Sequence, residues 1–224
     1  MAKRGNDTKF RILQEALNLF SKEGFNAVSI RTIADSVGIG NSALYKHFKN
    51  KREIFDSIVE LQKQRYTEQF SIVNSKICKI EDVKKICLAM FKFQTSDENI
   101  VAFRRLLLLE KFKNPKIAAI YKHFFVDIPL KAQSEIFKEL QQEGIMIDGD
   151  VQVFAMELYS PFYLFHFVEF NESELLPKLE KHLEYFFESH FKEPSKKAFF
   201  SNSSTQNCSS PETHSFQADD LGKC

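Results

Sequence analysis

The residues with the clearest binding chemistry lie on one face of a short predicted helix that follows Gly40. In a helix over about Asn41–Phe48, Leu44 and Phe48 are four residues apart and point in one direction. The opposite face carries hydroxyls, a methyl group and a cation, from Ser42, Ala43, Tyr45 and Lys46. Short polar groups suit the edges of bases and longer ones suit phosphates, so this face has the chemistry of a DNA recognition helix.

A helical hairpin over residues 29–51 must position this face. Ser29 is a plausible N-cap for the first helix, and Gly38 ends it where a left-handed backbone is cheap. Its apolar residues fall on one side at helical spacing: Ile30, Ile33, Ala34 and Val37. The alternative is a small helical hairpin with no role on DNA.

The order of residues in this region resembles the helix-turn-helix of the TetR family of bacterial transcriptional regulators. The matching stretches are Gly38-Ile39, Leu44-Tyr45-Lys46-His47-Phe48 and Asn50-Lys51, preceded by Ile12-Leu13, Ala16-Leu17, Leu19-Phe20 and Glu23-Gly24-Phe25. The resemblance covers roughly residues 8–51. A weaker one continues through Phe103-Arg104-Arg105-Leu106 to Asn114-Pro115 and Tyr121, which is similar to the regulatory domain of some members.

The resemblance implies roles for nine residues. Those that would mainly hold phosphates are Ser29, Arg31, Tyr45, His47 and Lys51; those that would face bases are Asn41, Ser42, Ala43 and Lys46. The chain departs from the family at Gly40-Asn41, where a Ser-Lys pair is frequent. The sequence therefore predicts a weaker cap on the recognition helix.

Charge is distributed unevenly along the chain. The net charge is only +1, but residues 1–51 contain nine Lys and Arg against four Asp and Glu, whereas residues 52–224 have a net charge of −4. A basic unit on a mildly acidic body confines attraction for phosphate to one end. The four cysteines form no CxxC motif and no Cys/His cluster at zinc spacing, and no signal peptide is visible. We expect free thiols, a cytoplasmic location, and no metal or cofactor.

Apolar periodicity and scarce glycine predict an all-α protein. We expect a three-helix DNA-binding domain over residues 1–51, with residues 1–6 as a mobile arm and the first helix capped by Asp7 or Thr8. A larger helical domain over 52–194 and a disordered polar tail over 195–224 would follow. The stretch 151–168 is apolar almost all round, but Glu157, Pro161 and His166 argue against a membrane span.

The large domain is rich in aromatic residues, and most of these are expected to be core. The resemblance implies in addition that this domain binds a small effector and dimerises. A pocket with apolar walls and a few polar groups suits a hydrophobic ligand. The candidate effector-binding residues are Phe103, Arg104, Tyr121, Phe124, Phe154, Tyr159, Tyr163 and His166. Arg104 or His166 would pair with an acidic group on it, or make a structural contact. A dimer interface is expected over about residues 151–191, with Leu183 and Phe187 in it.

These observations predict a sequence-specific DNA-binding transcriptional regulator. It would be a homodimeric repressor that a small hydrophobic effector releases from a palindromic operator. The alternative is a DNA-binding protein whose C-terminal domain binds another protein. We expect no enzyme, because the chain shows no nucleophile motif, no HExxH, no Gly-rich phosphate loop and no convincing carboxylate pair.

Overall fold

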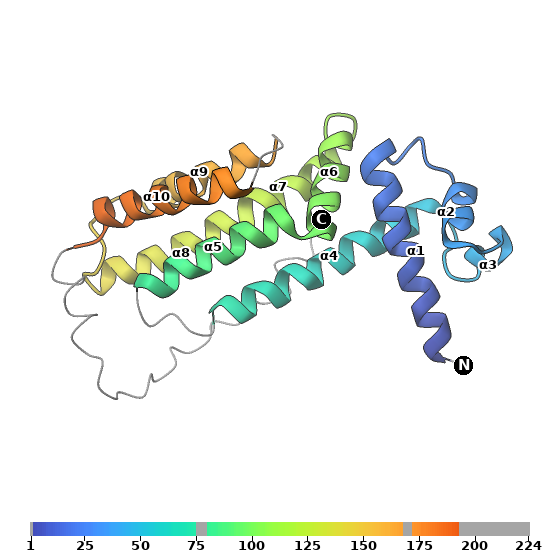
Figure 1. The fold of residues 1–224 in the computed structure, drawn as a ribbon, viewed down its shortest axis with the longest axis horizontal. Helices are drawn as coiled ribbons and strands as arrows, with labels where there is room; N and C mark the ends of the chain where they lie inside the picture. Colours follow the sequence, from blue (N-terminus) through green and yellow to red (C-terminus); the bar gives the residue numbers. More distant parts are fainter. Residues whose placement is uncertain (1, 75–79, 168–171, 193–224) are drawn as a thin grey trace. The chain divides into compact units, whose positions relative to one another are not determined.

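The structure, a computed structural model, describes residues 2–74, 80–167 and 172–192, and within these ranges it contains helices and no strand (Figure 1). The elements are α1 (Ala2–Glu23), α2 (Ile30–Val37), α3 (Asn41–Tyr45), α4 (Lys51–Asn74), α5 (Ile80–Ser96), α6 (Glu98–Glu110), α7 (Pro115–Lys122), the π-helix η1 (His123–Asp127), α8 (Ile128–Gln142), α9 (Val151–Phe165) and α10 (Glu172–His190). The predicted all-α fold is confirmed. The predicted tail, residues 195–224, lies outside the described ranges.

Helix α1 differs from its prediction at its start. It begins at Ala2, so the expected arm over residues 1–6, with a cap at Asp7 or Thr8, was wrong. Ala, Lys and Arg are good helix formers, and they extend the helix upstream of the expected cap. Its buried face includes Ile12 and Ala16, which are fully buried, whereas Phe10 is 48% exposed.

The chain divides into two compact units. The first comprises residues 1–75 and 92–121, and in it α1 packs against α6, α2 and α4. The helix-turn-helix thus shares one packed unit with α4, the end of α5, α6 and most of α7. The division at residue 51 that the sequence predicts remains a prediction about function.

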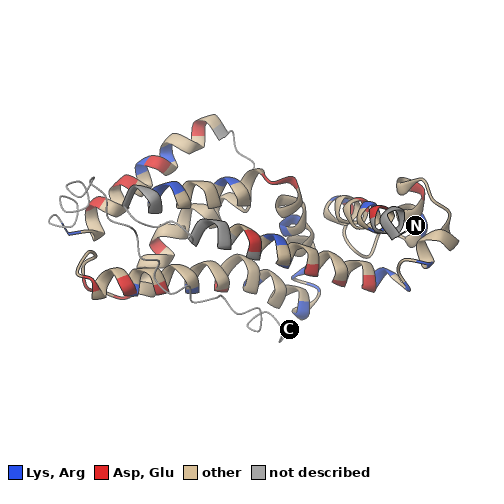
Figure 2. Cartoon of the chain, turned by 90° about the horizontal axis from the view of Figure 1, so that it is seen from below, with Lys and Arg blue, Asp and Glu red and all other residues tan. Residues whose placement is uncertain are grey.

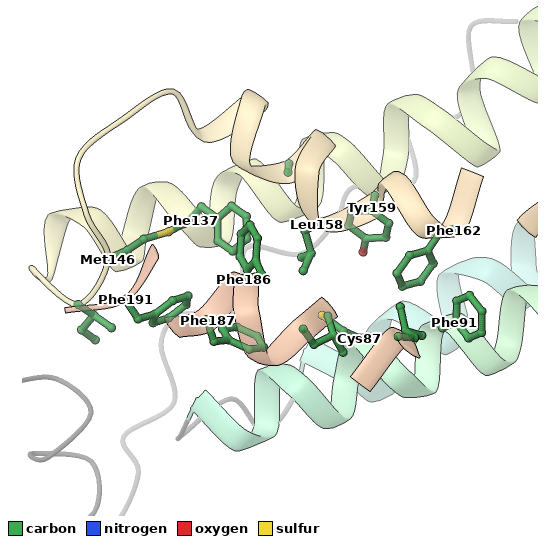
Figure 3. Packing of buried hydrophobic residues seen from close by; sticks show 14 of the residues in the cluster. Cys87, Phe91, Phe137, Met146, Leu158, Tyr159, Phe162, Phe186, Phe187 and Phe191 are labelled. Atoms are coloured by element: carbon green, nitrogen blue, oxygen red, sulfur yellow. The ribbon is translucent and has the colours of Figure 1, made fainter. Parts of the chain in front are cut away.

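The second unit comprises residues 76–91 and 122–224, and its core is aromatic (Figure 3). Phe137 of α8 stacks on Phe186 of α10 with ring centroids 5.6 Å apart, and Phe91 of α5 meets Phe162 of α9 edge-on at 5.1 Å. Edge-on and offset ring pairs are the favourable aromatic geometries. This packing fixes α9 and α10 against α5 and α8.

Two residues expected at a dimer interface belong to this core instead. Leu183 is fully buried and Phe187 is 7% exposed, and both lie in the hydrophobic cluster of the second unit. Helix α9 lies within the apolar stretch predicted over residues 151–168. Helix α9 buries Ala155, Leu158 and Phe162 and leaves its other face exposed. Among the described residues, no helix is long and apolar enough to cross a membrane.

Candidate DNA-binding site

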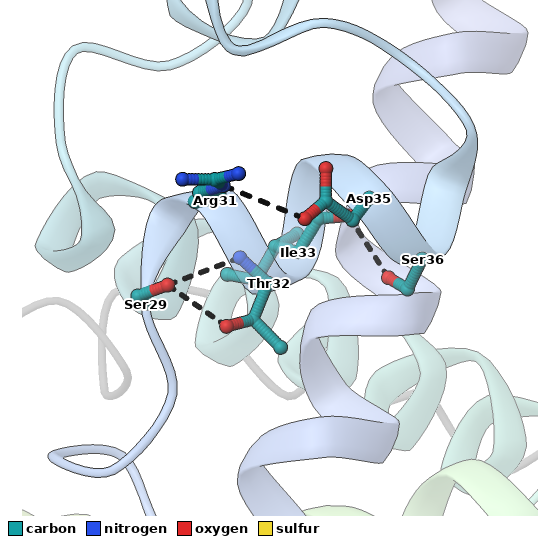
Figure 4. A network of polar contacts seen from close by, with 6 residues as sticks. All are labelled: Ser29, Arg31, Thr32, Ile33, Asp35 and Ser36. Atoms are coloured by element: carbon teal, nitrogen blue, oxygen red, sulfur yellow. Dashed lines mark hydrogen bonds and ion pairs between the residues drawn. The ribbon is translucent and has the colours of Figure 1, made fainter.

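Helix α2 is fixed at its start by the predicted cap (Figure 4). The Oγ of Ser29 accepts a hydrogen bond from the backbone N–H of Thr32 at 3.0 Å and lies 2.8 Å from the Thr32 hydroxyl. Arg31 lies on the exposed side, with its side chain 81% exposed and its Nε 3.8 Å from a carboxylate oxygen of Asp35. An ion pair this exposed contributes little to stability, so the Arg31 guanidinium remains available to an anion.

The turn and the start of α3 follow the sequence prediction, but the helix is shorter. Gly38 adopts φ +75°, the left-handed conformation expected of it. Gly40 is the N-cap of α3 and has no side chain to accept a hydrogen bond, in agreement with the predicted weak cap. The α-helix ends at Tyr45 rather than near Phe48. The backbone N–H groups of Lys46 and His47 bond to carbonyls three residues back, because the last turn tightens.

The two faces predicted for this segment are observed. Leu44 and Phe48 are buried, with exposed fractions of 0% and 1%. The residues that face outward are Asn41, Ser42, Tyr45 and Lys46, all exposed, with Ala43 and His47 half-buried at the margin. The segment therefore docks by its apolar stripe and presents hydroxyl, amide, phenol and ammonium groups to the outside.

Lys51 has a different environment from the one the resemblance implies. Its Nζ donates to the carbonyl oxygens of Phe25 at 2.7 Å, Asn26 at 3.3 Å and Val28 at 2.8 Å, and lies 4.5 Å from the centroid of the Phe25 ring. Burial lowers the pKa of Lys51, and the nearby Glu110 partly opposes this. An ammonium group has three protons. With three carbonyls to receive them, Lys51 fastens the start of α4 to the α1–α2 loop.

Glu110, at the end of α6, holds the same loop and was not expected from the sequence. Its carboxylate is 3% exposed and accepts from the backbone N–H of Phe25 at 3.1 Å. Gly24 beside it adopts φ +85°, and a Cβ there would lie 2.9 Å from Glu110 Oε1. Phe25 and Glu110 are 85 positions apart, so no local pattern could have indicated the hydrogen bond between them.

Helix α1 supplies a second support that the sequence did not indicate. The guanidinium of Arg11 donates to the carbonyl of Val37 at 2.8 Å, and so satisfies an acceptor at the end of α2. Lys9 lies over the ring of Phe48, with Nζ 5.3 Å from the centroid. A sequence pattern gives no sign of either contact, because the partners are 26 and 39 positions apart.

The candidate effector residues fall into separate groups. In the first unit, Phe103, Arg104 and Tyr121 are all buried, and Arg104 and Tyr121 are close enough to influence each other's pKa. In the second unit, the ring of His166 meets those of Tyr163 at 5.8 Å and Phe125 at 5.5 Å.

Three further candidates lie in the second unit. Tyr159 packs on Phe162 in the core, with ring centroids 4.8 Å apart. Phe154 lies at the opposite end of α9 from Tyr163, with its ring centroid 4.6 Å from that of His190. Phe124 is buried in the π-helix η1. Phe154 therefore packs at a different place from the Tyr163–His166 group.

Charged residues give no further site in the described part of the chain. Lys and Arg residues occur on helices of both units with Asp and Glu between them (Figure 2). No group of three or more His, Cys, Asp or Glu residues that could hold a metal is found among the described residues. The helix-turn-helix is thus the site with the clearest geometry for a ligand.

Comparison with known proteins agrees with this geometry. The sequence model of the N-terminal domain of bacterial regulatory proteins of the tetR family matches residues 12–58, which span α2 and α3 together with most of α1 and the start of α4. This chain belongs to the TetR family. It is therefore a transcriptional regulator with a DNA-binding helix-turn-helix.

Three TetR-family relatives illustrate the extent of the similarity. A helix-turn-helix transcriptional regulator of Staphylococcus aureus is 26% identical over 165 residues, which are 70% of this chain and 86% of that protein. A regulator from Mesorhizobium loti has the same fold, with a TM-score of 0.64, 19% identity, and coverage of 84% and 99% of the two chains. SmeT of Stenotrophomonas maltophilia, in complex with triclosan, has a TM-score of 0.63, 18% identity, and coverage of 84% and 94%. The relatives in sequence are regulators rather than enzymes.

Proposed function

We propose that this TetR-family regulator is a homodimeric repressor that acts in the cytoplasm and leaves a near-palindromic operator when a small effector binds. The observation that carries the proposal is the outward face of the α3 segment, where Asn41, Ser42, Tyr45 and Lys46 are exposed beside a buried Leu44. Amide and hydroxyl groups and a cation suit base edges and phosphates. Arg31 and His47 would add phosphate contacts, with Ser29 at the adjacent N-cap and Ala43 against a base.

In this proposal Lys51 stabilises the helix-turn-helix rather than binding a phosphate. Its ammonium group already donates to three carbonyls of the α1–α2 loop. A phosphate would have to replace one of these bonds.

The outer face of α9 supports the dimer in this proposal. Three large apolar side chains there, and Phe167 in the turn that follows, are 54–63% exposed and recur three or four residues apart around the small Ser160; the three on α9 are Val153, Met156 and Leu164. The Ser160 hydroxyl donates to the Met156 carbonyl at 2.7 Å, so it can leave water at little cost. A second copy of this chain is the occupant we propose, because a two-fold operator requires two reading helices.

A small effector completes the proposal. SmeT is described as a repressor and has been solved in complex with triclosan, which supports a small effector here. The candidates are the two groups defined above, Arg104 with Tyr121 and Phe103 in the first unit, and His166 with Tyr163 in the second. Effector binding would move α4 or α6, both of which contact the α1–α2 loop through Lys51 and Glu110.

Selection from a random DNA library tests the proposal. We expect the purified protein to enrich a two-fold symmetric sequence, with half-sites about one helical turn apart. Sedimentation of the bound species should give two copies per site. Failure to enrich any sequence would overturn the proposal. Enrichment of an asymmetric site by a monomer would contradict the dimer. Retention of a second, different protein by the α9 face would favour a protein-binding role for the C-terminal half.

A further inference from the structure

The interior of the first unit contains a polar group whose hydrogen bonds are missing. Gln62 of α4 is 0% exposed, yet neither its Nε2 nor its Oε1 has a hydrogen-bond partner among the described residues. It lies on the buried face of α4 with Phe55, Ile58 and Tyr66. An apolar side chain would fill this position without leaving any polar group unsatisfied, so the carboxamide requires an explanation.

Two contacts locate Gln62 relative to α6. At one end of α4, Lys51 interacts with Glu110, the last residue of α6. Further along, Arg65 bonds to Asp97, the N-cap of α6, at 2.6 Å. The start of α4 thus lies near the end of α6, and Arg65 lies at the start of α6. Gln62 is buried one turn before Arg65 on α4.

Helix α6 carries a buried cation. Arg104 is 6% exposed and donates to the backbone carbonyl of Gln94. Burial lowers its pKa, which the phenols of Tyr66 and Tyr121 partly oppose, so both phenols lie within electrostatic range of the guanidinium. Tyr66 is one helical turn from Gln62 on α4. The guanidinium and the carboxamide thus belong to one buried neighbourhood, formed by α4, the end of α5, α6 and α7.

The surroundings favour a ligand that is negative at one end and apolar at the other. Lys111 Nζ lies 4.4 Å from the centroid of the Tyr121 ring, which adds a second cation near Tyr121. Apolar side chains are available in the same unit, since Phe103 is fully buried and the rings of Tyr66 and Phe93 meet at 5.5 Å. A planar guanidinium matches the two oxygens of a carboxylate, and a carboxamide N–H can donate to the same group.

We propose that Arg104 and Gln62 bind the acid group of the effector, which is an amphipathic carboxylic acid. The carboxylate accepts from the guanidinium and from Gln62 Nε2, and the apolar part of the molecule lies against Phe103 and Phe93. Gln62 is kept unsatisfied in the free protein because its partner is the ligand. This inference rests on the proposed effector response and narrows the chemical class of the effector.

The test compares octanoate and decanoate with octanol and decanol. Binding is measured by calorimetry without DNA, and release by operator titration with and without each probe. We expect the two acids to bind and to weaken operator affinity about tenfold or more, and the alcohols to have much smaller effects. Equal effects of acid and alcohol, or no binding of either acid, would overturn the carboxylate assignment. Acids that bind without any operator being found would instead overturn the repressor proposal.

Variants separate ligand binding from packing. Arg104→Met should lower affinity for decanoate about tenfold or more, whereas Arg105→Met, which removes an exposed cation one residue away, should leave it unchanged. If Arg104→Met does not fold, Arg104→Lys keeps the charge but loses the planar fork and should show the same loss.

Gln62→Met gives the sharper result, because it replaces the unsatisfied carboxamide by an apolar group of similar size. The melting temperature of the ligand-free protein should rise by a few degrees while decanoate affinity falls. Gln64→Met, at an exposed position two residues away on α4, should change neither quantity. A Gln62→Met protein that melts earlier and binds decanoate as before would show that Gln62 has a structural role.

Discussion

At the scale of single residues, the ammonium group of Lys51 fixes the start of α4 to the α1–α2 loop. Its three carbonyl partners all belong to the α1–α2 loop, whose far end begins α2. The Lys46 side chain is instead exposed on the outward face of the α3 segment. Two lysines five positions apart therefore have different roles.

Substituting each lysine by Met distinguishes these roles. Lys51→Met should destabilise the protein by about 1–3 kcal/mol and weaken binding to all DNA sequences with little change in salt dependence. Lys46→Met should leave the melting temperature unchanged and reduce affinity for the operator. Thermal unfolding and operator titration over a range of salt concentrations measure both. A fall in the salt slope of roughly one unit for Lys51→Met would restore a phosphate contact to Lys51.

Gly24 is a second residue on which the contact between the α1–α2 loop and α6 depends. Gly24→Ala would force a Cβ toward Glu110 Oε1 at a backbone conformation, φ +85°, that alanine rarely adopts. We expect a loss of about 1–3 kcal/mol of stability in thermal or denaturant unfolding. Gly40→Ala is the matched control, because Gly40 has φ −72° and a Cβ there would come no closer than 3.9 Å to Ser42 Oγ. Equal stability of the two variants would contradict the argument.

At the scale of elements, α9 has one face in the core and one exposed face. Met156 and Leu164 are 56% and 59% exposed on that outer face. Replacing both by Glu should cost little stability in the monomer, since both positions can stay in water. The same change would place charges inside an apolar interface between two copies, at a cost of several kcal/mol.

Sedimentation velocity checks this expectation. The double variant Met156→Glu with Leu164→Glu should sediment as a folded monomer, with helical circular dichroism retained. Gln152→Glu, an exposed position on α9 beside the stripe, should remain a dimer. Leu183→Glu, in the core, should unfold the second unit instead. A double variant that still sediments as a dimer would place the interface elsewhere.

At the scale of the whole molecule, Cys87 reports on the opening of the second unit. Its side chain is 2% exposed in the aromatic core, and burial raises its pKa to about 12. The reactive thiolate is therefore scarce between about pH 7 and pH 9 while the unit is folded. Alkylation by iodoacetamide, located by peptide mass spectrometry, should reach Cys87 only as fast as the unit unfolds.

Denaturant provides the control for this measurement. The rate of labelling at Cys87 should rise with urea in parallel with loss of the helical signal. A Leu179→Ala variant, which opens a cavity in the same cluster, should label faster by the factor that its loss of stability predicts, typically 2–5 kcal/mol for such a truncation. Rapid labelling of Cys87 in the folded wild type would contradict its burial.

The sequence by itself determined the local features of the DNA-binding half. The Ser29 cap, the left-handed Gly38 and the docking of Leu44 and Phe48 all depend on residues within four positions of one another. Helical spacing and capping chemistry are properties of the chain segment, so they can be predicted before anything is folded. Arg104 became a candidate effector residue by a different route, because the resemblance to the TetR family implied that the large domain binds an effector.

Only the tertiary structure decided which side chains are already engaged. Lys51 donates to a loop 23–26 positions away, and Glu110 accepts from a backbone group 85 positions away. Apolar periodicity could not distinguish Leu183, which is in the core, from Leu164, which is exposed, because both lie on apolar helices. Nor could it show that Gln62 is buried without a partner. These outcomes depend on which distant segment covers a helix face, and that is determined by packing rather than by local spacing.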